Sequence, residues 1–93
     1  MIGVSLNIAM QSTNKTILIT GGGSGFGLAA AELLLEMDAN VVITGRSQER
    51  LDQAVTQLDS DKLLAVQADA TSTDDWKKTI SQTIDRFGAI DVL

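Results

Sequence analysis

The residues whose types and spacing could do chemistry are glycines in the first third of the chain. Gly21, Gly22, Gly23, Gly25 and Gly27 fall within seven consecutive positions, after a short β-branched and aliphatic run and before an alanine-rich helical pattern. Glycine permits a tight turn and lets a ligand approach the main chain closely. The helix that follows would point its unpaired N–H groups and the positive end of its dipole at the same space. The order of strand, glycine turn and helix therefore predicts a site for a phosphate or pyrophosphate.

Two common glycine-rich signatures fit this stretch poorly. A P-loop needs Lys and Ser/Thr directly after its last glycine, whereas Leu28 and Ala29 follow Gly27, so a P-loop is rejected. The general G-x-G-x-x-G/A pattern is matched only from Gly25 through Ala30, which is late relative to the strand. A plain loop is the remaining alternative, but this many glycines between a buried strand and a helix favour nucleotide binding.

The string TGGGSGFG, which begins at Thr20, resembles the TGxxxGxG signature of short-chain dehydrogenases/reductases. The resemblance covers nearly everything from residue 15 to residue 93, and the tail FGAIDVL is similar to the segment that leads into the NNAG motif of that family. It implies a parent oxidoreductase that transfers hydride between a nicotinamide cofactor and a carbonyl or alcohol substrate. Around the turn, the cofactor-binding residues that it implies are Gly21, Gly23, Ser24, Gly25, Phe26 and Gly27.

The strands and helices that must position this turn alternate along the chain. Apolar runs predict parallel strands at residues 16–20, 41–44, 63–68 and 90–93, with a helix after each of the first three. Such alternation implies right-handed crossovers. The predicted fold class is α/β, a Rossmann-type doubly wound parallel sheet with three αβα layers and strand order 3-2-1-4, truncated after its fourth strand. The domain organisation that we expect is an extension at residues 1–14 and a nucleotide-binding half-domain at residues 15–93.

Each helix carries its own start, stop and packing signals. The first is apolar over so wide a face that we expect it to be buried, and it should end at Asp38 in a left-handed conformation. Ser47 should cap the second helix, and Ser72 or Thr73 the third, which Gly88 should stop. The second helix has an apolar stripe at Leu51, Ala54, Val55 and Leu58, with Glu49, Arg50, Asp52 and Gln53 outward; the stripe predicted for the third is Trp76, Ile80, Ile84 and Phe87.

The residues after the second strand bear on the choice of cofactor. An acidic residue at that position holds the ribose 2′-OH of NAD, whereas an Arg accommodates the 2′-phosphate of NADP. Here the strand is followed by Arg46 and Ser47 with no carboxylate. A guanidinium can grip a phosphate through paired hydrogen bonds and stack on adenine. We therefore expect a preference for NADP(H). Two points weigh against it, namely that Arg46 can instead be an ordinary exposed cation, and that Ser24 stands where some NADP-preferring members of the family carry a second basic residue.

Two further positions gain an expected role from the family resemblance. Asp69 and Ala70 follow the third strand and resemble the pair of an Asp and a small residue that contacts the adenine. The Asp69 carboxylate can accept from the exocyclic amine, and it can equally form a turn beside Thr71. Asp91, in the tail, is expected to be structural.

Composition excludes several classes of function. The chain has 93 residues, 44% hydrophobic content and a net charge of −5, which argues against nucleic acid as a partner. It has no Cys and no His, which excludes thiol chemistry and makes the usual transition-metal sites unlikely candidates. The apolar opening from Met1 to Met10 lacks a basic region and is too short to span a membrane, so we expect a cytoplasmic protein with no membrane partner.

The chain also contains no Tyr, so it cannot supply the phenol that these enzymes use to move a proton. In the family the active-site Ser and the Tyr-x-x-x-Lys pair would follow residue 93, and the complete protein would be a homo-oligomer. The favoured hypothesis is a portion of a normal NADP-dependent oxidoreductase. The alternatives are a truncated product or a non-catalytic module that only binds nucleotide, and last an S-adenosylmethionine methyltransferase, which would want an acidic residue where Gly45 and Arg46 stand.

Overall fold

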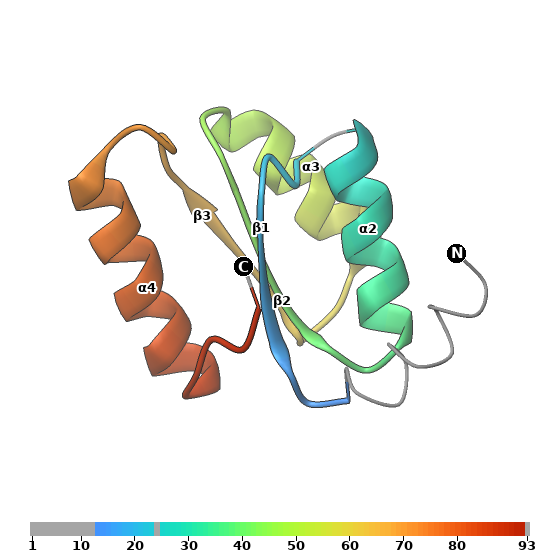
Figure 1. Cartoon of the computed structure of the whole chain (residues 1–93). Helices are drawn as coiled ribbons and strands as arrows, with labels where there is room; N and C mark the ends of the chain where they lie inside the picture. The colour runs from blue at the N-terminus through green and yellow to red at the C-terminus, as the bar shows by residue number, and fades with distance from the viewer. Residues whose placement is uncertain (1–12, 24, 93) are drawn as a thin grey trace.

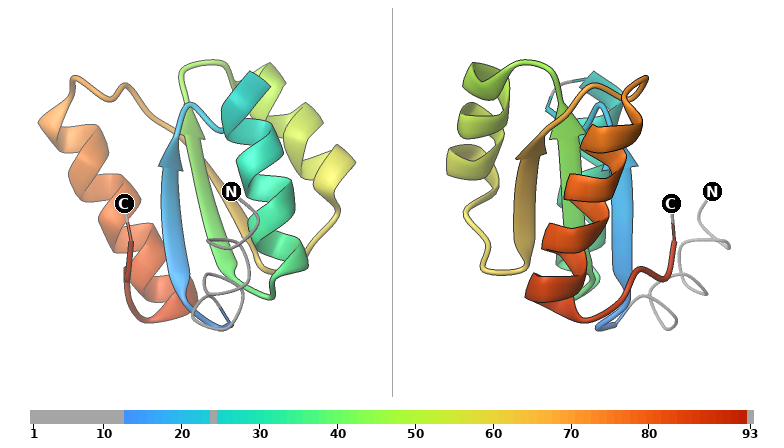
Figure 2. Two further views of the ribbon diagram at one scale, coloured as in Figure 1. Left: turned by 45° about the vertical axis from the view of Figure 1, so that its right-hand side comes forward. Right: turned by 90° about the vertical axis from the view of Figure 1, so that its left-hand side faces the viewer.

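The computed structural model describes residues 13–23 and 25–92, and within them strands and helices alternate as predicted (Figure 1). The elements are β1 (Thr16–Thr20), α2 (Gly25–Glu36), β2 (Asn40–Gly45), α3 (Gln48–Leu58), β3 (Leu63–Gln67) and α4 (Thr73–Phe87). Helices α2 and α3 cover one face of the sheet and α4 covers the other, which the two turned views make plain (Figure 2). The predicted three-layer α/β fold of Rossmann type is confirmed.

The sheet is parallel and has the order β1-β2-β3. Thr16 pairs with Asn40 at one end of the β1–β2 ladder and Thr20 with Thr44 at the other. On the outer side of β1, Val92 forms a single parallel bridge with Ile17. The predicted strand over residues 90–93 is shorter in the structure: of its described residues, Asp91 and Val92 form backbone hydrogen bonds with Thr16 and Leu18 of β1, whereas Ile90 is not in a strand. Its position beside β1 agrees with the order 3-2-1-4, and Leu93 lies outside the described residues.

Alternation along β2 divides the core into two halves. Val41 and Ile43 face α2 and α3, whereas Val42 faces α4, and all three are fully buried. The larger half lies under α2 and α3, where its buried members are Ala31, Ala39, Val41, Ile43, Leu51, Ala54 and Leu63. On the α4 side, Leu18, Val42 and Val66 pack against Trp76 and Phe87. Both faces of β2 are covered, as its continuous apolar run predicts.

Helix α2 is less buried than its sequence predicts. Ala31 is its one fully buried residue, and Leu28, Leu34 and Leu35 pack partly against the core. Phe26, by contrast, is 90% exposed and Leu33 45%. The helix lies on the sheet along one stripe, and Phe26 and Leu33 lie outside it. The expectation of a wholly buried helix is therefore corrected.

Only part of the predicted stripe of α4 packs on the sheet, namely Trp76 and Phe87. Thr79 and Thr83 are buried, whereas Ile80 and Ile84 are each 44% exposed. Each step of four residues advances about 40° around a helix, so a stripe of fourth residues drifts away from the sheet. The buried hydroxyls donate to backbone carbonyls one turn earlier, at 2.8 Å for Thr79 and 2.7 Å for Thr83. These internal hydrogen bonds let threonine occupy an apolar interface.

The predicted helix ends and caps are confirmed. The hydroxyl oxygens of Ser47 and Ser72 accept from backbone N–H groups three residues later, at 3.2 Å in each case. Asp38 has a φ of 66°, as expected for a left-handed end of α2, and Gly88 caps α4. The structural role expected of Asp91 is also confirmed, because its Oδ2 accepts from the Thr16 N–H at 2.9 Å, at the start of β1.

Candidate functional site

The glycine turn joins β1 to α2 and is fastened to the neighbouring strand. The N–H groups of Gly21 and Gly22 both donate to the carbonyl oxygen of Thr44, at 2.8 and 3.2 Å. Gly21 and Gly25 have φ values of 73° and 60°, in the left-handed region that favours glycine. A side-chain carbon at either position would meet no atom within 4 Å, so both border open space. The turn is therefore fixed to β2 by hydrogen bonds and borders open space at Gly21 and Gly25. A ligand that contacts the main chain requires this combination.

Gly22 and Gly27 are small for a different reason, which is close packing. A Cβ atom on Gly27 would lie 2.6 Å from the carbonyl oxygen of Gly21, and one on Gly22 would collide with the side chain of Ile43. These glycines bring the start of α2 and the strand β2 against the turn. The predicted cofactor residue Gly27 thus has a structural reason for its size, and the sequence offered no signal for the contact between Gly22 and Ile43.

The electrostatics at the start of α2 favour an anion. The helix has 12 residues, and its first turn contains no acidic side chain. Its unpaired N–H groups and the positive end of its dipole therefore act without a competing local carboxylate. Phe26, in this first turn, is almost fully exposed, and Ser24 lies outside the described residues.

A cleft of about 210 Å³ connects this turn with the end of β2. Its lining residues come from both segments and from the start of α3: Gly21, Gly23, Gly45, Arg46, Ser47, Arg50 and Leu51. The structure thus brings together four predicted residues that lie far apart in the sequence, namely Gly21 and Gly23 with Arg46 and Ser47. Arg50 was missed, because the helical pattern placed it on the outward face of α3. The available signal was its position in the first turn of a helix that starts where β2 ends.

Arg46 and Asp69, predicted for different parts of the cofactor, lie next to each other. The Arg46 guanidinium Nη2 is 3.4 Å from Asp69 Oδ1, and the two side chains are 76% and 42% exposed. The Nε2 of Gln67 donates to the Arg46 carbonyl at 2.9 Å and so links the ends of β2 and β3. Because both ends of this pair are solvated, its contribution to stability is small. The arginine is available to an incoming ligand.

Asp69 also forms the turn beside Thr71 that the sequence indicated as the alternative to adenine binding. Its Oδ1 accepts from the N–H and the hydroxyl of Thr71, at 2.9 and 2.7 Å. These two hydrogen bonds lower the pKa of Asp69 below its ordinary value of 3.8. Burial opposes them to a smaller extent, and the charge and hydrogen bond of Arg46 add a still smaller lowering effect. The carboxylate therefore stays ionised at neutral pH and can only accept hydrogen bonds.

The loop after β3 is fixed to the start of α4. The Ala70 carbonyl accepts from Trp76 Nε1 at 2.8 Å, and the Asp69 N–H donates to Asp75 Oδ2 at 2.7 Å. Ala70 is exposed at the surface. Asp69 and Ala70 are thus presented on a braced loop near Arg46, and not in the lining of the cleft itself.

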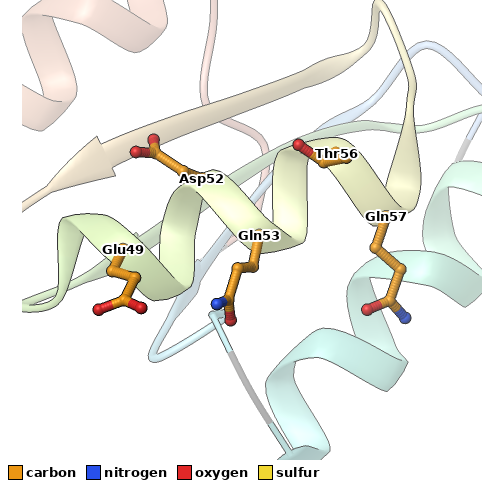
Figure 3. Close-up of a pocket in the computed structure, with 5 residues that line it drawn as sticks. All are labelled: Glu49, Asp52, Gln53, Thr56 and Gln57. Carbon is orange, nitrogen blue, oxygen red and sulfur yellow. The ribbon is translucent and has the colours of Figure 1, made fainter.

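A larger hollow, of about 600 Å³, lies on the outer face of α3 and contains none of the predicted site residues. Five polar side chains of this single helix line it: Glu49, Asp52, Gln53, Thr56 and Gln57. Figure 3 shows them spread along the helix without converging on a point. Among the residues that the structure describes, no cluster of three or more potential metal ligands occurs. The smaller cleft at the glycine turn is therefore the better candidate site.

The fold and the cleft place the chain among dinucleotide-binding folds of the α/β class. A family model described as short chain dehydrogenase matches residues 15–93. The chain therefore belongs to the short chain dehydrogenase family, whose members bind nicotinamide dinucleotides in general. None of the described helices is long and apolar enough to cross a membrane.

Curated relatives share this region of sequence. An uncharacterized oxidoreductase of Staphylococcus aureus is 37% identical over 81 residues, which are 87% of this chain and 35% of that protein. A dehydrogenase/reductase SDR family member of Caenorhabditis elegans is 38% identical over 82 residues, covering 85% of this chain and 32% of the relative. The chain thus spans about a third of the length of these relatives.

Solved structures agree with this assignment. A short chain dehydrogenase from Bacillus anthracis superposes with a TM-score of 0.81 at 40% identity, over 85% of this chain and 34% of that one. A short-chain dehydrogenase/reductase of unknown function from Caenorhabditis elegans, solved with cofactor, gives a TM-score of 0.81 at 36% identity, over 88% and 32% of the two chains.

Proposed function

We propose that this chain is the NADP(H)-binding portion of an oxidoreductase that transfers hydride between nicotinamide and a carbonyl or alcohol substrate. The observation that carries the proposal is the cleft that joins the glycine turn to Arg46 and Ser47. It places an open, glycine-lined main chain beside cationic and hydroxyl groups. The first suits the pyrophosphate of the dinucleotide and the second suits a 2′-phosphate on its adenosine.

In this proposal each segment takes one part of the cofactor. The main chain of Gly21, Gly23 and Gly25 and the start of α2 hold the pyrophosphate, with Ser24, Phe26 and Gly27 in the same turn. Arg46 and Ser47 contact the 2′-phosphate. Asp69 and Ala70 contact the adenine, for which the ionised carboxylate is a suitable acceptor of the exocyclic N–H.

The preference for NADP(H) over NAD(H) follows from charge. The residues that line the cleft include two arginines and no carboxylate. A carboxylate at the end of β2 would accept from a ribose 2′-OH and repel a 2′-phosphate, whereas a guanidinium does the opposite. The one nearby acid, Asp69, pairs with Arg46 at the rim.

The substrate and the proton donor belong to the parent protein in this proposal. The chain spans about a third of its relatives and contains no Tyr. When bound, the nicotinamide would supply the hydride chemistry, and this chain would bind and orient the dinucleotide. The catalytic phenol and the substrate pocket would come from the remainder, and the complete protein would form a homo-oligomer.

The test is calorimetric titration of the intact protein with NADPH and NADH. We expect NADPH to bind more tightly, and Arg46→Ala to weaken NADPH binding by about tenfold while leaving NADH nearly unchanged, because only NADPH carries the phosphate. Lys77→Ala, which removes an exposed cation from α4, is the control. Equal affinities for the two dinucleotides before and after the Arg46 substitution would refute the proposed preference.

A further inference from the structure

Arg50 occupies a place that the glycine turn leaves available to a basic side chain. It lines the cleft together with Gly21, Gly23 and Arg46, although it comes from the first turn of α3. A side-chain carbon at Gly23 would lie 3.5 Å from the Cβ of Arg50, so the base of this side chain lies beside the turn. Some NADP-preferring members of the family carry a second basic residue in the turn itself, where this chain has Ser24. Arg50 lines the same cleft from α3.

The two arginines of the cleft differ in their ion pairs. Arg46 is paired with Asp69, whereas no ion pair involves Arg50 within residues 13–23 and 25–92. The acidic neighbours of Arg50 on α3 are Glu49 and Asp52, and both line the separate hollow on the outer face of that helix (Figure 3). Of the α3 residues that line the cleft, Arg50 is therefore the charged one.

The start of α3 adds two favourable features. The Ser47 hydroxyl oxygen accepts from the Arg50 N–H, which leaves its own proton available to donate to a phosphate oxygen. The positive end of the α3 dipole lies at this same turn. A phosphate monoester carries a charge of about −1.5 to −2 at pH 7, more than one partly neutralised guanidinium balances.

We infer that Arg50 determines the specificity for the 2′-phosphate of the dinucleotide, as the second cation of the cleft, while Arg46 is shared between that phosphate and Asp69 at the adenine. This inference rests on the proposed function and refines it, because it assigns a share of the discrimination between NADPH and NADH to a residue of α3. It predicts that the phosphate is held between two arginines four residues apart.

The experiment compares Arg50→Gln, Arg50→Lys and Arg46→Gln with the wild-type intact protein by calorimetric titration. We expect Arg50→Gln to weaken NADPH binding by about tenfold or more, since a charge-assisted hydrogen bond is lost, and to leave NADH binding within about twofold. Arg50→Lys should keep most of the preference. The fragments 2′,5′-ADP and 5′-AMP provide a readout that is independent of hydride transfer, and only the first should respond to Arg50→Gln.

Controls separate this inference from the proposed function. Lys77→Gln should change neither affinity, and the thermal midpoint of Arg50→Gln should equal that of the wild type because the side chain is exposed. If the wild type prefers NADPH and Arg50→Gln keeps the full preference, the assignment of Arg50 is overturned and the proposed function stands. If the wild type binds both dinucleotides equally, the proposed preference and the role of Arg50 fail together.

Discussion

Gly27 is the glycine of the turn whose added side chain would collide with backbone atoms. Its missing side chain lets α2 begin against the turn, because a Cβ atom would lie 2.6 Å from the Gly21 carbonyl oxygen and 2.9 Å from the Gly22 Cα. Both obstacles are backbone atoms, which cannot rotate away as the end of a flexible side chain can. The position of the helix N-terminus above the ligand space therefore depends on this one glycine.

We predict that Gly27→Ala lowers the free energy of unfolding by about 1–3 kcal/mol, the usual cost of overpacking, and weakens dinucleotide binding because the start of α2 must move away from the turn. Urea unfolding and calorimetric titration measure the two effects. Gly45→Ala is the matched control for stability, since its Cβ would make an ordinary contact of 3.7 Å with Leu51 Cδ2. An alanine at position 27 that is as well tolerated as one at position 45 would contradict the packing argument.

Arg46 and Asp69 show, also at the residue scale, how two predicted roles can share one interaction. Their pairing at 3.4 Å was not expected, since the sequence assigned one to the phosphate and the other to the adenine. Both side chains remain partly exposed, so the pair restricts the guanidinium without burying it. This arrangement orients the arginine before a ligand arrives and reduces the charge that it can offer, which is why Arg50 becomes important.

At the scale of elements, a polar cluster ties together the beginnings of the three strands. Lys62, before β3, donates from Nζ to Asp38 Oδ1 at 2.6 Å, to the Asp38 carbonyl at 3.1 Å and to Asn14 Oδ1 at 3.2 Å. The Asn14 N–H donates to the same Asp38 carbonyl at 2.9 Å. Asn14 and Asp38, before β1 and β2, both have left-handed backbones, with φ values of 61° and 66°. This cluster lies at the end of the sheet opposite the glycine turn.

The backbone of Asp38 supplies a prediction for the turn between α2 and β2. Asp38→Ala keeps a left-handed backbone that alanine disfavours, so we expect it to be less stable to unfolding than Asp38→Gly by about 1–2 kcal/mol. Asp38→Gly should lie close to the wild type, because relief of strain offsets the loss of a partly exposed ion pair worth about 0–1 kcal/mol. Denaturant unfolding of both variants, with Glu36→Ala as the control for losing a nearby carboxylate, measures the difference. An alanine variant equal to the glycine variant would show that the strain argument is wrong.

The whole molecule, as described, has one side that is poorly covered. Among the described residues, the outer edge of β1 is paired only near its start, where Thr16 and Leu18 share backbone hydrogen bonds with Asp91 and Val92. An open hollow beside it is lined by Ile17, Leu18, Ile19, Thr20 and Trp76. On α4, Ile80 and Ile84 are also partly exposed. A strand edge that is paired over only part of its length, with apolar side chains nearby, favours association with other chains.

We predict that the 93-residue polypeptide, prepared by itself, associates at micromolar concentrations, and that the pair Ile80→Lys and Ile84→Lys shifts it toward a monomer of about its formula mass of 9.8 kDa. Light scattering after size-exclusion chromatography measures the mass. The control pair is Ser81→Lys and Gln82→Lys, which adds the same charge at exposed polar positions of the same helix. A wild-type polypeptide that is already monomeric under these conditions would contradict the prediction.

The sequence by itself determined the order of the elements, the glycine turn, the cap at Ser47 and the left-handed end at Asp38, and it narrowed the cap of α4 to Ser72 or Thr73. These features depend on local backbone preferences and short-range hydrogen bonds, which a few neighbouring residues fix. It also indicated that Gly21 and Arg46 belong to one site, because parallel strands place their carboxyl ends at the same edge.

Only the tertiary structure decided which faces are covered and which side chains meet. Periodicity could not tell that Thr83 of α4 faces the sheet while Ile84 does not, because the two lie about 100° apart on a helix and the docking angle is set by the partner surface. It could not place Arg50 in the cleft, because the helical pattern shows only that Arg50 points away from the core. That outward side faces Gly23 only because α3 packs next to the glycine turn. Contacts between residues far apart in sequence follow from packing and sheet register, and no local pattern encodes them.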